Sequence, residues 1–323
     1  MLVPEPRADR AATAPAELVR AATVARRFFI EGRSKSEIAA EFGVSRFKIA
    51  RILDEARATG IVRIDIRLPA GLDARLADEL RQAFGLRRAI VVDTPDEPEA
   101  LMRQELARAA AALLGEIVTA DDVLGVGYGR TLTVMAETLR LPPCPVVQLT
   151  GALLGVNMEE NSVEFVRQIS ARSGGRPYSM YVPQVLPDLK TAALLRQQPE
   201  VAEAYRMFDQ VTTAVVAVGS WSPPHSQLYD ALPERVRAAL ERKGAIAEVC
   251  AVLLDRDGRQ VASDFTERCI SLRGEQLKRV GEVVAVAGGV VKTAAVRAVL
   301  AGGWASSLIA DTSLATALLA GDH

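Results

Sequence analysis

Two glycine-rich turns carry the residues best suited to binding an anion. In the first, Gly127 and Gly129 precede Arg130 and Thr131, where a short β-branched segment gives way to a helical pattern. Glycine lets a ligand approach the backbone closely, and the free N–H groups of a helix N-terminus attract negative charge. Arg130 adds a positive charge and Thr131 adds a hydroxyl group. The same residues also suit an ordinary tight connection between strand and helix, so both interpretations stay open here.

The second turn contains Gly288 and Gly289, with Lys292 following closely. A cation near a helix N-terminus is unfavourable unless an anion lies beside it. Two such turns in one α/β sheet predict a ligand at the carboxyl ends of the strands. Gln148 and Glu248, each expected at a strand edge, have polar groups that can hydrogen-bond hydroxyls of a ligand. Glu248 is equally well explained as a surface carboxylate or an ion-pair partner.

A third cluster suits DNA rather than a small molecule. Residues 35–54 fit a helix-turn-helix, because Ala39 is small where two helices must cross and Gly43 supplies a tight turn. Arg and Lys at the start of the second helix can pair with guanine O6 and N7 in the major groove, and serine hydroxyls can bind phosphates. The predicted DNA contacts are Ser34, Lys35, Ser36, Ser45, Arg46, Phe47, Lys48 and Arg51. The alternative is a helical hairpin with a solvated basic face.

The distribution of charge supports the DNA-binding interpretation. The chain of 323 residues has a net charge of −1, from 39 basic and 40 acidic residues. Between positions 20 and 67 there are eleven Lys or Arg residues against six Asp or Glu, which leaves 28 against 34 elsewhere. A basic segment joined to an acidic remainder is typical of a small DNA-binding module on a carrier domain.

Other kinds of site find little support in the sequence. The cysteines Cys144, Cys250 and Cys269 are far apart and form no CxxC pair, so we expect no metal and no cofactor. His225 and His323 form no evident pair with a carboxylate or a nucleophile, so we predict no catalytic residue. No apolar run is long enough to cross a membrane, and residues 1–15 do not resemble a signal peptide. We therefore expect a cytoplasmic protein without a membrane partner.

The elements that hold these residues form two groups. Apolar residues recur at helical spacing in 16–31 and 35–41, a third helix follows Ser45 to about Thr59, and residues 61–68 alternate as a half-exposed strand. Ser45 is a good N-cap for the third helix. The predicted domains are a disordered leader at 1–15, a helix-turn-helix DNA-binding domain at 16–68, and an effector-binding and oligomerisation domain at 69–323.

In the larger domain, helical segments alternate with short β-branched strands. The expected helices are 72–84, 99–117, 131–139, 162–172, 192–208, 233–243, 292–300 and 312–319. The expected strands are 88–93, 123–127, 146–149, 211–218, 249–255, 283–287 and 307–309. This alternation predicts a doubly wound α/β domain with a mostly parallel sheet.

In several of these motifs the sequence resembles the SorC-type sugar-binding transcriptional regulators. In the first domain the resemblance lies in residues 37–39, 42–46, 51–53 and 56–62. In the larger domain it lies in residues 125–131, 148–151, 244–249, 255–258, 285–292 and 308–312. It covers nearly the whole chain after the leader, and the order and spacing of these motifs are more specific than any one of them.

The resemblance implies a larger domain similar in fold to sugar-phosphate isomerases and CoA transferases, acting as a sensor in a homodimer or homotetramer. Three departures limit what carries over. Thr150 stands where some members have a lysine that forms an imine with an aldehyde sugar. Lys35 and Ile49-Ala50 replace a common glutamine and a common Val-Ser pair, so the operator sequence does not carry over.

These observations predict a DNA-binding transcriptional regulator of carbohydrate metabolism, whose operator affinity is controlled by a sugar, a polyol or a sugar phosphate. Its expected partners are double-stranded operator DNA, that effector and further copies of the chain. Two alternatives remain. One is an isomerase-like or transferase-like enzyme, in which Glu248, Asp209, Asp264 or Lys292 would transfer protons. The other is a DNA recombinase, which should carry metal-binding carboxylates or a serine nucleophile.

Overall fold

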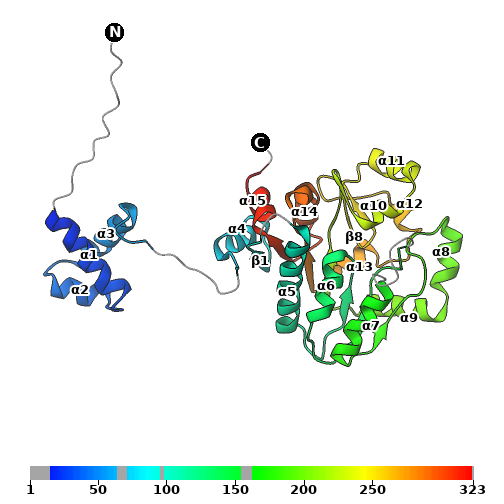
Figure 1. The fold of residues 1–323 in the computed structure, drawn as a ribbon, viewed down its shortest axis with the longest axis horizontal. Helices are drawn as coiled ribbons and strands as arrows, with labels where there is room; N and C mark the ends of the chain where they lie inside the picture. Colours follow the sequence, from blue (N-terminus) through cyan, green and yellow to red (C-terminus); the bar gives the residue numbers. More distant parts are fainter. Residues whose placement is uncertain (1–14, 64–70, 95–97, 154–161, 322–323) are drawn as a thin grey trace, which may run out of the picture. The chain divides into compact units, whose positions relative to one another are not determined.

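The computed structural model describes residues 15–63, 71–94, 98–153 and 162–321 and divides the chain into two compact units, 1–66 and 67–323 (Figure 1). The predicted leader at 1–15 lies almost entirely outside the described residues. So does most of the strand expected at 61–68, while residues 61–63 form no strand. His323 also lies outside them.

The smaller unit is a three-helix bundle with a helix-turn-helix. Its helices are α1 Pro15–Phe29, α2 Lys35–Glu41 and α3 Arg46–Ala58. The core of this unit contains Val24, Ala25, Ile38, Ala39, Ile49 and Leu53. Gly43 turns the chain between α2 and α3 with a φ of +62°, in the left-handed region that glycine tolerates best. The expected helix-turn-helix geometry is therefore present.

Serine caps fix where α2 and α3 begin. The Ser34 hydroxyl accepts the Glu37 backbone N–H at 3.3 Å, and the Glu37 carboxylate accepts the Ser34 N–H at 2.8 Å, which completes a capping box. The Ser45 hydroxyl accepts the Lys48 N–H at 3.2 Å, so Ser45 is the N-cap of α3, as its position predicted. These caps set the first turn of α3, which carries the predicted base contacts.

The larger unit is built on a seven-stranded sheet in the order β1-β12-β11-β5-β2-β3-β4, and all its pairs are parallel. The strands are β1 Arg88–Val92, β2 Leu124–Val126, β3 Val146–Gln148, β4 Pro177–Tyr178, β5 Thr213–Ala217, β11 Glu282–Val286 and β12 Ser307–Asp311. Each central strand buries both faces, as parallel strands usually do.

Helices cover both faces of this sheet, which confirms the doubly wound fold class (Figure 1). One core contains side chains of α5 Glu99–Ile117, α6 Arg130–Thr138 and α7 Ser162–Ser173. The core on the other face contains side chains of α4 Ala74–Phe84, α9 Pro199–Phe208, α13 Gly274–Arg279, α14 Thr293–Ala301 and α15 Thr312–Leu319. The helix expected at 192–208 is two helices, α8 Leu189–Arg196 and α9, because Pro199 begins a new one.

A second, antiparallel sheet was not predicted. It has the order β10-β9-β8-β6-β7, with β6 Gly219–Trp221, β7 Pro224–His225, β8 Ala247–Val249, β9 Val252–Leu254 and β10 Gln260–Val261. The helices α10 Gln227–Ala231, α11 Glu234–Arg242 and α12 Ser263–Thr266 accompany this sheet in the sequence. The strand expected at 249–255 is interrupted, because Cys250 and Ala251 turn the chain between β8 and β9 with φ values of 49° and 66°, so that β8 and β9 form a hairpin.

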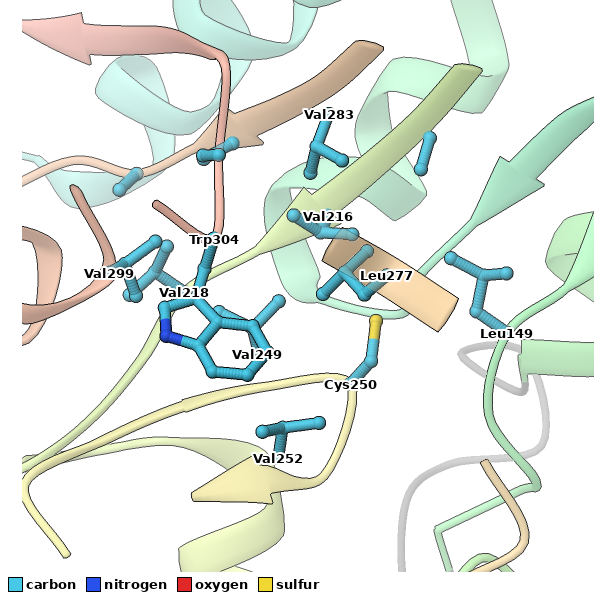
Figure 2. Close-up of a cluster of buried hydrophobic side chains, with 14 of the residues drawn as sticks. Leu149, Val216, Val218, Val249, Cys250, Val252, Leu277, Val283, Val299 and Trp304 are labelled. Atoms are coloured by element: carbon cyan, nitrogen blue, oxygen red, sulfur yellow. The ribbon is translucent and has the colours of Figure 1, made fainter. Parts of the chain in front are cut away.

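The hairpin packs on the parallel sheet through a shared apolar core. Figure 2 shows Val249, Cys250 and Val252 of the hairpin beside Val216 of β5 and Leu277 of α13. As a result of this packing, the end of β8 lies near the carboxyl end of β5. The antiparallel sheet therefore adds side chains to the edge where the two glycine-rich turns lie.

Candidate effector pocket and DNA-binding surface

A pocket lies where the chain leaves the carboxyl ends of β2, β5 and β11. From β2 the chain runs through α6 to β3, toward one edge of the sheet. From β11 it runs through α14 to β12, toward the other edge. The strand order therefore reverses around β5, the topological switch point where α/β sheets usually bind ligands. The lining includes Gly129, Arg130, Thr131, Glu248, Gly288 and Lys292, six of the nine effector contacts predicted from the sequence.

The turn after β2 requires glycine for packing. A Cβ on Gly129 would lie 2.6 Å from the Cβ of Ala217 on β5, and a Cβ on Gly127 would lie 3.3 Å from the Val215 carbonyl oxygen. Gly129 is the N-cap of α6 and provides no side-chain cap to the first turn. Gly127 does not line the pocket, so its contribution is the close approach of β2 to β5.

The turn after β11 differs from the expectation of outward-pointing N–H groups. The Gly289 N–H donates to the buried carboxylate of Asp311 at 2.8 Å, and Gly289 does not line the pocket. Gly288 does line it, and a Cβ there would lie 2.5 Å from Leu106 Cδ1. Lys292 ends a short 3₁₀ turn, Val290–Lys292, before α14 begins. At this turn the lysine side chain, rather than the Gly289 N–H, is therefore placed to meet an anion.

Lys292 is half-buried and lines the pocket. Its Nζ donates to the Val218 carbonyl oxygen at 2.8 Å. Burial, together with the charge of Arg130, lowers the pKa of Lys292 to about 8, although the charge of Glu248 opposes the shift. Such a lysine gains from a negative ligand beside it, because the protein supplies too little negative charge to compensate for lost hydration.

Glu248 projects from β8 into a space that glycine leaves open. A Cβ on Gly219, its partner in β6, would lie 2.5 Å from Glu248 Oε1. The Ser226 hydroxyl donates to Oε1 at 3.0 Å, and the Ala251 N–H donates to Oε2 at 3.3 Å. Burial raises the pKa of Glu248, although these hydrogen bonds and the charge of Lys292 oppose the shift. Of the open alternatives, this geometry favours a pocket-lining acid over a surface carboxylate.

A cluster of three polar side chains that the sequence did not predict also lines the pocket. Glu99 of α5 pairs with Arg103 at 2.9 Å and with His225 Nε2 of β7 at 3.3 Å. Burial raises the pKa of Glu99, but the hydrogen bond and charge of Arg103 outweigh it, so the pKa is lowered overall. Burial and the charge of Lys292 lower the pKa of His225, although Glu99 opposes them. Sequence reasoning missed this group because positions 99 and 225 meet only in the folded chain.

Gln148 is the third predicted contact that does not line the pocket. Its amide nitrogen donates to the Thr150 carbonyl oxygen at 2.7 Å, and its Oε1 accepts the Met180 N–H at 2.8 Å. The buried side chain thus links β3 to the segment near residue 180. Thr150 and Gln184 line the pocket instead and offer a hydroxyl and an amide.

The predicted DNA contacts form an exposed surface on the smaller unit. Arg46, Phe47, Lys48 and Arg51 all lie exposed on α3. The Arg51 guanidinium lies 3.4 Å from the Glu55 carboxylate, one turn further along the helix. Ser34, Lys35, Ser36 and Ser45 are exposed near the starts of α2 and α3. The hydroxyls of Ser34 and Ser45 act as acceptors in their caps, which leaves their protons free to donate.

Comparisons with known proteins cover nearly the whole chain. Residues 69–320 match the family model described as "Putative sugar-binding domain". The uncharacterized transcriptional regulator YjhU of Escherichia coli is 30% identical over 91% of this chain and 92% of its own length. The erythritol catabolism regulatory protein EryD of Brucella abortus is 28% identical over 90% of this chain and 93% of its own length.

A solved structure matches the fold across both units. The full-length sorbitol operon regulator SorC of Klebsiella pneumoniae superposes with a TM-score of 0.72 at 21% identity. The match covers 94% of this chain and 99% of that one. Among the residues the structure describes, no helix is long and apolar enough to cross a membrane.

Proposed function

The chain belongs to the SorC-type family of sugar-binding transcriptional regulators, and from this premise we propose that a sugar-like effector in the pocket controls its binding to operator DNA. The helix-turn-helix α2–α3 would contact the operator. The pocket at the carboxyl ends of β2, β5 and β11 would hold a sugar, a polyol or a sugar phosphate.

The observation that carries this proposal is the set of charges around the pocket. Arg103, Arg130 and Lys292 line it against two acids, Glu99 and Glu248. Three cations against two acids leave positive charge in excess in this lining, although Arg130 also lies 3.5 Å from the Asp230 carboxylate, which does not line the pocket. A phosphate beside Lys292 and the first turn of α6 would balance that excess.

The other polar groups of the pocket suit hydroxyls. Glu248 and Ser226 are already hydrogen-bonded to each other, and Thr150, Thr131 and Gln184 line the same cavity. A carboxyl group, hydroxyls and amides together offer both donors and acceptors, which a polyhydroxylated ligand needs. This mixture supports a sugar-like ligand over an aromatic or purely anionic one.

The names of the relatives support regulation over catalysis. They include a sorbitol operon regulator, an erythritol catabolism regulatory protein and a deoxyribonucleoside regulator. Each aligns with at least 90% of this chain, helix-turn-helix included. We therefore favour a cytoplasmic regulator of carbohydrate use over an isomerase-like enzyme or a recombinase.

We also propose that the protein acts as a homodimer or homotetramer. One α3 helix offers a short base-reading surface, whereas two can read half-sites about 34 Å apart, or a multiple of that distance. Light scattering at micromolar concentration, with and without operator DNA, measures the mass directly. A monomer under both conditions would contradict the proposed assembly.

Three measurements on the purified full chain test the function. Footprinting on its own upstream region should show protected sites at moderate salt. Thermal unfolding with panels of sugars, polyols and their phosphates should reveal the effector, since a ligand stabilises by RT ln(1 + [L]/Kd). The same compounds should be recovered unchanged. Absence of any protected site would refute the regulator, and turnover of the stabilising compound would instead favour an enzyme.

A further inference from the structure

One aromatic side chain in the first turn of α3 is unusually exposed. Phe47 has 73% of its surface exposed, whereas the other large apolar residues of α3 face the core, with Ile49 and Leu53 fully buried and Ile52 packed against it. The capping hydroxyl of Ser45 fixes the turn that carries Phe47. A single exposed apolar side chain is common on protein surfaces, so it is the position of Phe47 in the first turn of α3 and the charges around it that point to a partner.

The charges around Phe47 indicate what kind of partner that is. The Arg46 guanidinium lies 5.0 Å from the centre of the Phe47 ring, and Arg51 is one helical turn further along on the same face. Lys48 is also exposed, and the first turn of α3 has no acidic residue. An apolar ring among cations complements a polyanion that also presents an apolar group.

We infer that Phe47 reads the 5-methyl group of a thymine in the major groove of the operator. This inference rests on the proposed function, because it assumes that α3 enters the major groove. Among the base edges there, thymine alone presents an apolar group, its methyl. Phe47 contacts that methyl, while Arg46, held against the ring, pairs with an adjacent guanine or a phosphate. Phe47 thereby sets specificity at one base pair of each half-site.

Replacing thymine by uracil tests this contact, because uracil lacks only the methyl group and keeps its pairing edge. Operator fragments identified by footprinting would carry this change at one position per half-site at a time, at fixed salt. For the wild type, we expect uracil at one symmetric position to weaken binding by roughly fourfold per half-site, about the value of burying one methyl-sized group. Phe47→Ala should bind the thymine fragment more weakly and should not distinguish it from the uracil fragment.

Two control variants show whether the preference for thymine belongs to the Phe47 side chain. Phe47→Leu keeps an apolar side chain and should retain part of that preference. Ile30→Ala removes another exposed apolar residue, 78% exposed and outside α3, and should leave binding and preference unchanged. If the wild type binds its operator specifically but ignores uracil at every position, the inference is wrong and the proposed function stands. It is equally wrong if Phe47→Ala keeps the full preference. If the wild type showed no specific DNA binding, both the inference about Phe47 and the proposed function would be wrong.

Discussion

At the scale of a single residue, the burial and charge of Lys292 determine how it can bind an anion in the effector pocket. Its half-buried side chain donates to a backbone carbonyl, and the charge of Glu248, whose own pKa is raised by burial, acts on it. A charged group in this setting binds an anion more strongly than a surface lysine does, because little water competes for it. Both the charge of this amine and its position should therefore affect ligand binding measurably.

The first prediction concerns pH. Burial lowers the pKa of Lys292 to about 8, so the amine is charged below that pH and neutral above it. An anionic ligand favours the charged form, and its affinity should therefore fall as the pH rises through about 8, by at most about tenfold per pH unit. Calorimetry between pH 7 and 9.5 measures this slope. The affinity for a neutral polyol should not fall in this way, and Lys292→Gln should remove the fall for an anionic ligand. A phosphate ligand that bound with constant affinity over this range would contradict the placement of Lys292 in the effector site.

The second prediction concerns the separation of the two binding activities. Lys292→Ala should weaken binding of a phosphorylated effector by roughly tenfold to a hundredfold, the loss of one charge-assisted hydrogen bond. Operator affinity without effector should stay nearly unchanged, because Lys292 lies in the larger unit. Arg46→Ala should show the reverse pattern. The exposed Lys243, paired with Asp264, supplies the control Lys243→Ala. If Lys292→Ala bound the effector as tightly as the wild type, Lys292 would not belong to the effector site.

At the scale of elements, short helices depend on their caps. Helix α2 has only seven residues, so the capping box of Ser34 and Glu37 satisfies a large share of its free N–H groups. Its stability matters for DNA binding because α2 packs with α1 and α3 in the small core that holds α3 in place.

Removing the cap should therefore loosen the helix-turn-helix. Ser34→Ala should destabilise it by about 1 kcal/mol, which corresponds to roughly fivefold faster amide hydrogen exchange in α2 and α3. Ser36→Ala is the matched control, since Ser36 is an exposed residue of the same helix and is not its N-cap. Hydrogen exchange suits this test because both tryptophans, Trp221 and Trp304, lie in the larger unit and do not report on the smaller one. Equal exchange rates in the two variants would show that the cap contributes little.

At the scale of the whole molecule, a regulator must couple its two binding sites. If effector changes operator affinity, operator must change effector affinity by the same factor, because the two ligands share one thermodynamic cycle. We expect a factor of about 5 to 150, the usual range for such coupling. Titration of effector into free protein and into protein saturated with operator measures it. Identical effector affinities in both titrations would mean that the pocket does not control DNA binding.

The sequence by itself determined the elements whose signals are local. Gly43, the serine caps and the apolar spacing predicted α2 and α3 almost to the residue, because turns and caps depend on neighbouring positions. The helix expected at 99–117 is α5 with the same bounds. The alternation of strands and helices was enough to predict a doubly wound parallel sheet, and hence the edge at which the pocket lies.

Only the tertiary structure decided which side chains meet at that edge. The antiparallel sheet escaped prediction because its strands have two or three residues each, too few for a period to appear, and because Cys250 and Ala251 are unusual residues for a tight turn. Glu99 and His225 lie 126 positions apart and meet at 3.3 Å. A contact of that kind depends on the packing of whole elements against one another, which no local pattern of residues specifies.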